Sequence, residues 1–190
     1  MGAGVGLMPL GHTTSCGDPM PLTTRPILAR LMAILMLPAA SVSQAGPFED
    51  AQAARQRGDF ATAFNQFRSM AAGGDASAQF ELSLLYLNGQ GVRQDAKESM
   101  YLLKLASVHG HTSAQSNLGV AFNRGRFLPQ DGVKAYIWSS MAADSGDRVA
   151  KTNRDVVVST LNPQQLELAK NLALQCKQRL SEVQKLPQCL

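Results

Sequence analysis

Apolar and small residues recur along the middle of the chain with the spacing of an amphipathic helix. In residues 114–122 they occupy positions i, i+4, i+7 and i+8, which places Ala114, Leu118, Ala121 and Phe122 on one helix face. Residues 78–86 repeat that face one unit earlier. A glycine and then a second apolar segment follow each of these stretches, so the pattern predicts pairs of helices joined by short loops.

This pattern repeats at a fixed interval of 36 residues. The positions that keep the interval include Gly74, Gly110 and Gly146; Asp59, Asp95 and Asp131; and Ala78, Ala114 and Ala150. A fixed period of this length is typical of solenoids, in which each helix pair buries its apolar face against its neighbours. The sequence therefore predicts an all-α fold, an α/α solenoid of stacked antiparallel helix pairs.

Two copies of one motif occupy the centre of the chain. The first copy contains Ala78, Leu82, Tyr86, Gly89, Gly91, Val92, Asp95, Ala106 and Gly110. The second contains Ala114, Leu118, Gly119, Phe122, Gly125, Asp131, Ala135, Trp138, Ala142 and Gly146. Both resemble the Sel-one-like repeat (SLR), a relative of the tetratricopeptide repeat (TPR). The resemblance implies a right-handed TPR-like superhelix. The second copy departs from the family's loop, with Phe127-Leu128-Pro129 in place of Gly-Val.

Capping residues and glycines divide the chain into a repeat domain over residues 46–186 and a tail over 187–190. The predicted units are residues 48–74, 75–110 and 111–146, followed by a C-terminal cap over 147–186. Asp95 with Glu98 predicts a capping box. Residues 156–160 are rich in β-branched residues, which favour a strand, but we predict a helix because neighbouring segments offer no sheet.

The predicted cap differs from the full copies in its apolar pattern. Arg154 stands where Leu82 and Leu118 stand, which is the polar change expected of a terminal repeat. Asn162 is expected to cap a last helix with Pro163 at its first position, which would close the end of the solenoid.

Residues 1–45 have the features of an N-terminal extension followed by a cleavable export signal, with Met20 as an alternative start. Arg25 and Arg30 precede an apolar stretch, and Ser43 and Ala45 are small residues of the kind signal peptidase reads. Residues 31–42 are too few for a spanning helix, which needs roughly 20 residues. We therefore predict cleavage after Ala45 and a periplasmic or secreted protein that keeps no membrane insertion.

Candidate chemistry is sparse in the remaining sequence. The net charge of the full sequence is +4, which is small and dispersed, so nucleic-acid binding has little support. His109 and His111 could be half of a metal site, but no other histidine remains after cleavage and zinc usually takes three or four protein ligands. We interpret His111 as a helix cap equivalent to Asp75 and Asp147. Trp138 replaces Leu102 and is expected in the core, and we predict no cofactor, metal or catalytic residue.

Cys176 and Cys189 are the two cysteines beyond the predicted cleavage site. A continuous helix would separate them by about 20 Å, well beyond a disulfide's reach of about 7 Å. Pro187 disfavours helix at Leu186, so the tail can fold back. The alternatives are a bridge within the chain and pairing between chains.

The resemblance implies a non-catalytic adaptor, because family members serve in envelope assembly, signalling and secretion. We therefore predict a scaffold of the cell envelope that holds a protein or peptide on its concave face, which the first helix of each unit lines in TPR-like solenoids. Helical spacing assigns the following residues to that face: Ser77, Phe80, Leu84 and Leu87 in one unit, and Ser113, Ser116, Val120 and Asn123 in the next. The alternatives are an enzyme that uses His109, His111 and nearby carboxylates, and a protein that binds the cell wall.

Overall fold

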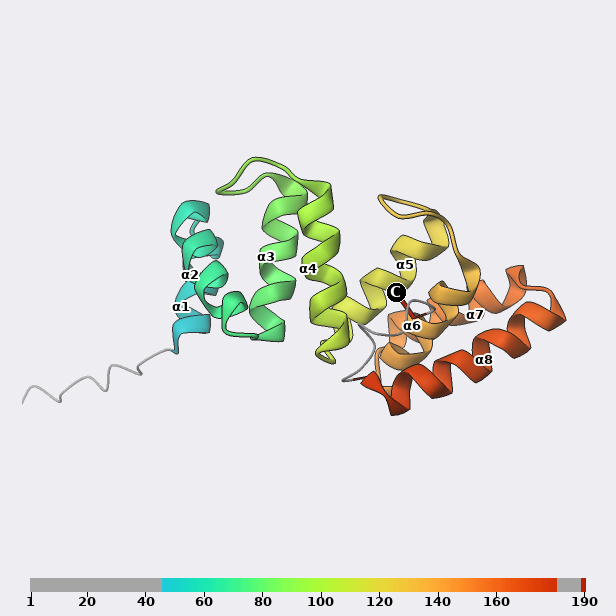
Figure 1. Ribbon diagram of the computed structural model, residues 1–190. Coiled ribbons are helices and arrows are strands. Elements are labelled where there is room, and N and C mark those ends of the chain that lie inside the picture. Colours follow the sequence, from blue (N-terminus) through green and yellow to red (C-terminus); the bar gives the residue numbers. More distant parts are fainter. Residues whose placement is uncertain (1–45, 181–188) are drawn as a thin grey trace, which may run out of the picture. The chain divides into compact units, whose positions relative to one another are not determined.

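Eight α-helices make up the part of the chain that the computed structural model describes, residues 46–180 and 189–190. They are α1 (Pro47–Gln56), α2 (Phe60–Ala72), α3 (Ala76–Asn88), α4 (Ala96–Val108), α5 (Thr112–Arg124), α6 (Gly132–Asp144), α7 (Arg148–Thr160) and α8 (Pro163–Gln178) (Figure 1). No strand occurs among these residues, which confirms the all-α prediction. Residues 156–160 lie in α7, so the predicted helix is right. The predicted signal and residues 181–188 lie outside the described residues.

Polar side chains satisfy free backbone N–H groups at the start of α2 to α8, which explains why these helices begin where they do. The caps are Asp59, Asp75, Asp95, His111, Asp131, Asp147 and Asn162. The capping box predicted for Asp95 and Glu98 is wrong, because the backbone N–H of Asp95 donates instead to the carbonyl of Tyr86 at 3.0 Å. A capping box forms at α8, between Asn162 and Gln165.

Consecutive helices pack in pairs, and the pairs stack on one another. The pairs are α1 with α2, α3 with α4 and α5 with α6, while α2–α3, α4–α5 and α6–α7 contacts join successive units. The buried apolar residues form an N-terminal cluster from α1 to α4 and a C-terminal cluster from α4 to the chain end. The helix α4 serves both, because Leu102 joins the first cluster while Met100 and Leu103 join the second.

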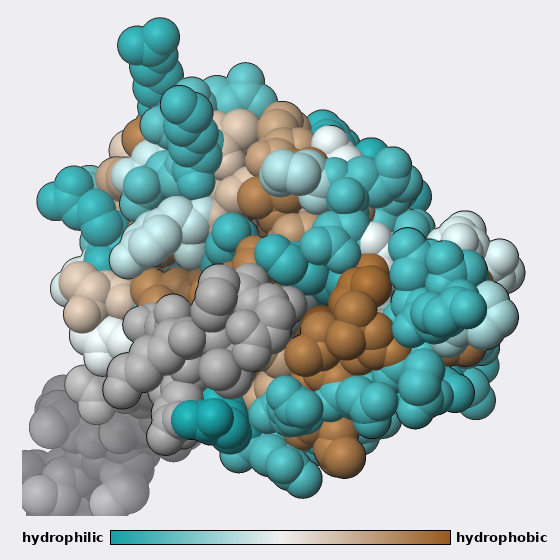
Figure 2. Space-filling model, turned by 45° about the vertical axis from the view of Figure 1, so that its right-hand side comes forward, coloured by the Kyte–Doolittle hydropathy of each residue, from teal (hydrophilic) through white to brown (hydrophobic). Residues whose placement is uncertain are grey.

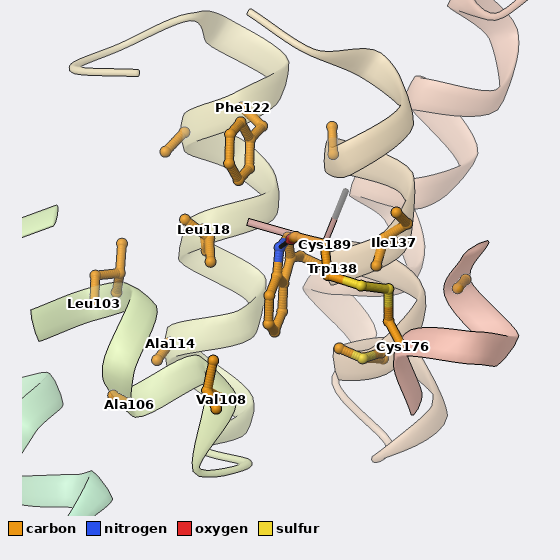
Figure 3. Packing of buried hydrophobic residues seen from close by; sticks show 14 of the residues in the cluster. Leu103, Ala106, Val108, Ala114, Leu118, Phe122, Ile137, Trp138, Cys176 and Cys189 are labelled. Atoms are coloured by element: carbon orange, nitrogen blue, oxygen red, sulfur yellow. Dashed lines mark hydrogen bonds between the residues drawn. A yellow bond between two sulfur atoms is a disulfide. The ribbon is translucent and has the colours of Figure 1, made fainter. Parts of the chain in front are cut away.

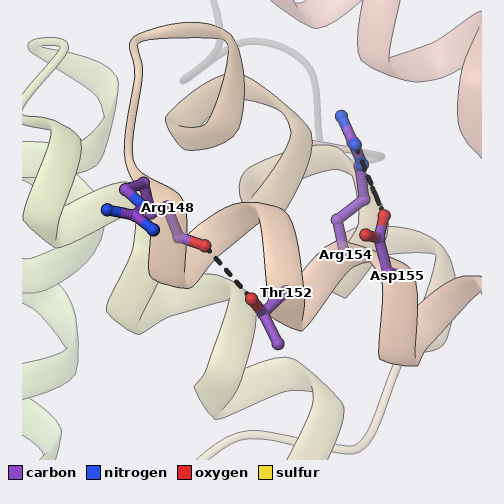
Figure 4. A network of polar contacts seen from close by, with 4 residues as sticks. All are labelled: Arg148, Thr152, Arg154 and Asp155. Atoms are coloured by element: carbon purple, nitrogen blue, oxygen red, sulfur yellow. Dashed lines mark hydrogen bonds and ion pairs between the residues drawn. The ribbon is translucent and has the colours of Figure 1, made fainter.

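The C-terminal cap is not a regular helix pair. Both α7 and α8 pack on α6 more extensively than on each other. Arg154 remains partly exposed and forms an ion pair with Asp155 at 3.4 Å, on a stretch of α7 that also carries Arg148 and Thr152 (Figure 4). The terminal repeat therefore replaces a buried leucine with a charged side chain, as predicted.

Cys189, near the end of the chain, is bonded to the core by a disulfide and by a hydrogen bond from Trp138. A disulfide joins Cys176 of α8 to Cys189, and the Trp138 indole N–H donates to the carbonyl of Cys189 at 2.6 Å (Figure 3). All three side chains are fully buried. Cys189 thus lies against the last helix, and Trp138 is a core residue as predicted.

The face of the domain shown in Figure 2 is mainly polar, with separate apolar areas. None of the described helices is long and apolar enough to cross a membrane.

Candidate functional site

The loops that join α3 to α4 and α5 to α6 have the same backbone conformation. Gly89 and Gly125 end their helices in the left-handed region, with φ of 67° and 64°. The side chain of Gln94 donates to the carbonyl of Leu87 at 2.7 Å, and Gln130 donates in the same way to Asn123 at 2.9 Å. The departure of the second copy from the family's motif therefore leaves the loop unchanged.

Phe127 occupies the position that Gly91 holds in the first loop. Its φ of 63° is close to the 70° of Gly91, and it is the non-glycine residue with positive φ among those described. A left-handed conformation is strained for a bulky side chain. At Gly91 a side chain would meet the backbone of Phe60, whereas Phe127 is 45% exposed and lies 4.9 Å below the Arg126 guanidinium.

A pocket of about 180 Å³, which we call the loop pocket, lies among α3, α4, α5 and this second loop. Its apolar lining comprises Leu84, Leu87, Met100, Leu103, Val120 and Ala121. The remaining lining residues are Ser83, Ser99, Asn117, Arg124, Arg126 and Phe127. No carboxylate lines it, and within the described residues neither arginine takes part in an ion pair.

Three of the eight residues assigned to the concave face line this pocket, namely Leu84, Leu87 and Val120. Ser77 and Asn123 are half-buried outside it and Ser113 is exposed outside it. Ser116 departs from its assignment because it is 6% exposed. The helix α5 packs against α4, α6 and α7, which leaves less of its surface free than the sequence pattern suggested.

Phe80 is half-buried outside the loop pocket. Its ring stacks on His111 at 4.6 Å between centroids and packs against the C-terminal cluster, so the turn between α4 and α5 covers it. Phe80 is therefore a weaker candidate for partner contact than Leu84 or Leu87.

His109 and His111 make separate contacts. The Nδ1 atom of His109 lies 2.9 Å from Oε1 of Gln79, whose amide N–H donates to the carbonyl of Ala71. Nδ1 of His111 accepts from the N–H of Ala114 at 3.2 Å, so its cap requires a neutral ring. Burial lowers the pKa of His111, and Asp75 partly opposes that shift. No group of three metal-binding side chains occurs in the described part of the chain.

The sequence pattern missed the arginines and the aromatic residue at the mouth of the pocket. Arg124 and Arg126 flank the loop glycine Gly125, and their charge alone is typical of ordinary surface residues. Phe127 did carry a signal, since an aromatic residue replaced a glycine at the matching repeat position.

These paired, stacked helices define an α/α solenoid repeat protein. The family model for the Sel1 repeat matches residues 76–111 and 112–147, so the chain contains two Sel1 repeats. This confirms the resemblance seen in the motif, and the family supports a role as a helical scaffold for protein interactions.

Two solved structures share the fold. A protective antigen present in uropathogenic Escherichia coli strains, which displays an SLR fold, is 27% identical with a TM-score of 0.64 over 75% of this chain and 33% of its own. A Sel1 repeat protein from Oxalobacter formigenes is 23% identical with a TM-score of 0.54, over 66% and 53% of the two chains. The chain thus spans about one third and one half of these proteins. No curated protein matches it.

Proposed function

We propose that this protein is a non-catalytic scaffold that holds a protein or peptide partner at the loop pocket. The observation that carries the proposal is the pocket itself, where Leu84, Leu87 and Val120 line a cavity that opens to the surface. Leu84 and Leu87 come from α3 and Val120 from α5, which are the first helices of the two full units. A concave apolar site with a few polar groups is typical of binding sites.

Capture of partners from cell extract tests this proposal. Leu87→Ser should weaken capture at least fivefold with little change in the thermal midpoint, because Leu87 is half-buried and belongs to neither core cluster. Val149→Ser is the matched control, since Val149 is 66% exposed on α7, away from the pocket. Equal capture by wild type and Leu87→Ser would contradict the proposal.

We also propose that the scaffold acts in the cell envelope after cleavage of residues 1–45. The support is the sequence of that segment, with basic residues, a short apolar stretch and small residues at Ser43 and Ala45. N-terminal sequencing of protein from an envelope fraction should give Gly46 first. A mature chain that starts before Arg30 would contradict cleavage.

A further inference from the structure

We propose that the loop pocket recognises an acidic peptide segment, in which one large apolar side chain enters the cavity and an adjacent carboxylate binds Arg124 and Arg126. This inference rests on the proposed function and specifies the chemistry of the partner. Three separate features of the pocket support it: its size, its charge and the conformation of Phe127.

The size of the pocket matches one large side chain. An apolar cavity of about 150 Å³ holds a benzene ring, and the loop pocket measures about 180 Å³. Leu84, Leu87 and Val120 supply apolar contacts for a phenylalanine or leucine side chain. The partner therefore inserts an anchor residue and leaves its backbone at the mouth.

The charge at the mouth is uncompensated. Arg124 and Arg126 are exposed, line the pocket and form no ion pair within the described residues. A guanidinium binds a carboxylate through two parallel N–H donors, which gives direction as well as attraction. With no carboxylate in the lining, the site favours an anchor residue that has Asp or Glu beside it.

Phe127 has a side chain that its loop does not need. The first loop adopts the same conformation with glycine at the matching position, without the strain of a bulky residue in the left-handed region. The ring lies against Arg126 and lines the pocket. We assign to Phe127 the role of an aromatic wall that contacts the anchor and positions Arg126.

Fluorescence anisotropy with capped, labelled peptides tests the inference. The probes are an extended peptide with a central Phe flanked by Glu, the same peptide flanked by Gln, and the same peptide flanked by Lys. The Glu-flanked probe should bind about tenfold more tightly than the Gln-flanked probe, and the Lys-flanked probe should bind least. Raising the salt concentration should reduce the advantage of Glu, because exposed charges are screened.

Variants of the chain assign the effect to the pocket. The double variant Arg124→Gln, Arg126→Gln should abolish the preference for Glu over Gln while binding of the Gln-flanked probe stays unchanged. Arg148→Gln, which removes an exposed arginine of α7 away from the pocket, is the matched control and should change nothing. Phe127→Gly should weaken both probes several-fold without lowering the thermal midpoint.

The outcomes separate this inference from the proposed function. If all three probes bind equally and Leu87→Ser weakens each, the pocket binds an apolar anchor and the acidic preference is wrong. If no probe depends on Leu87, the proposed function also falls. If anionic phospholipid vesicles or single-stranded DNA bind through Arg124 and Arg126 while the Glu-flanked probe does not, the peptide is the wrong ligand.

Discussion

The two full repeats have the same backbone plan, but the residues at two matching positions have different roles. In each, two helices of 13 residues flank a loop whose glycine ends the first helix. The first repeat has Gly91 in the loop and Leu102 in the second helix, where the second repeat has Phe127 and Trp138. The two residues of the first repeat contact a neighbouring unit, since Gly91 lies against Phe60 and Leu102 joins the N-terminal cluster.

The residues of the second repeat make contacts that the first cannot. Phe127 lines the loop pocket, and the indole N–H of Trp138 donates a hydrogen bond to the carbonyl of Cys189. The difference shows that a repeat keeps its backbone through caps, glycines and small buried residues. Residues at other positions can therefore differ between repeats, and in the second repeat one lines a pocket and another binds the C-terminal residues.

Trp138→Leu, which copies the first repeat, should have the largest effect on stability. Trp138 is fully buried, and the variant leaves a cavity and an unpaired carbonyl at Cys189. We expect a loss of about 3–5 kcal/mol in the free energy of unfolding, measured by chemical denaturation. Trp138→Phe keeps most of the volume and should lose about 1–3 kcal/mol. Equal losses for both variants would show that the N–H donor alone matters.

Removal of the disulfide should come next in size. The disulfide closes a short loop between residues 13 apart. Cys189→Ala removes it, and in the chain-entropy model this should lower the free energy of unfolding by about 3 kcal/mol. Cys176→Ala and the double variant should lose about the same amount, because each removes the same bond. Non-reducing mass spectrometry of the chain from Gly46 should find monomers without free thiols. Disulfide-linked dimers would instead support pairing between chains.

Gly119→Ala should cost about 1–3 kcal/mol in the free energy of unfolding, although alanine is the better helix former. A Cβ at Gly119 would meet Ser139, with its backbone nitrogen 3.0 Å away. The matching residue of the first repeat is Ser83, which already carries a side chain. Ser83→Ala is therefore the control and should have a smaller effect. A stabilised Gly119→Ala variant would show that α5 and α6 can separate at little cost.

The smallest effect concerns the pH dependence of the His111 cap. Its pKa in the folded chain is lowered, mainly by burial, so the unfolded chain binds more protons below about pH 6.5. The stability from the cap is fully present above that pH and is lost as the pH falls through the lowered folded pKa. His111→Asp copies Asp75 and should remove this loss, measured as thermal midpoints between pH 7 and pH 5. An unchanged profile would contradict the role of a neutral ring.

Helix positions and capping residues followed from the sequence because they depend on local chemistry. The 36-residue period, the loop glycines and the Asp caps each act within one or two turns of helix, and the structure places them as predicted. His111 was identified by its repeat position for the same reason.

The pocket could not be derived in this way, because it depends on three helices and a loop. Helical spacing found Leu84, Leu87 and Val120, but it could not show that His111 covers Phe80. The burial of Ser116 depends on neighbours that the periodic pattern of one helix does not contain.

Hydrogen bonds from the side-chain amides of Gln79 and Gln115 link successive units of the solenoid. Gln79 donates to the carbonyl of Ala71, and Gln115 donates one repeat later to Ser107, so the same side chain joins each unit to the last turn of the unit before it. At these two junctions, therefore, the hydrogen bond joins residues only eight positions apart. A duplicated copy of residues 76–111, inserted after His111, would meet the same bond at both ends. Such a chain could lengthen by whole repeats through gene duplication, without any compensating change at its termini.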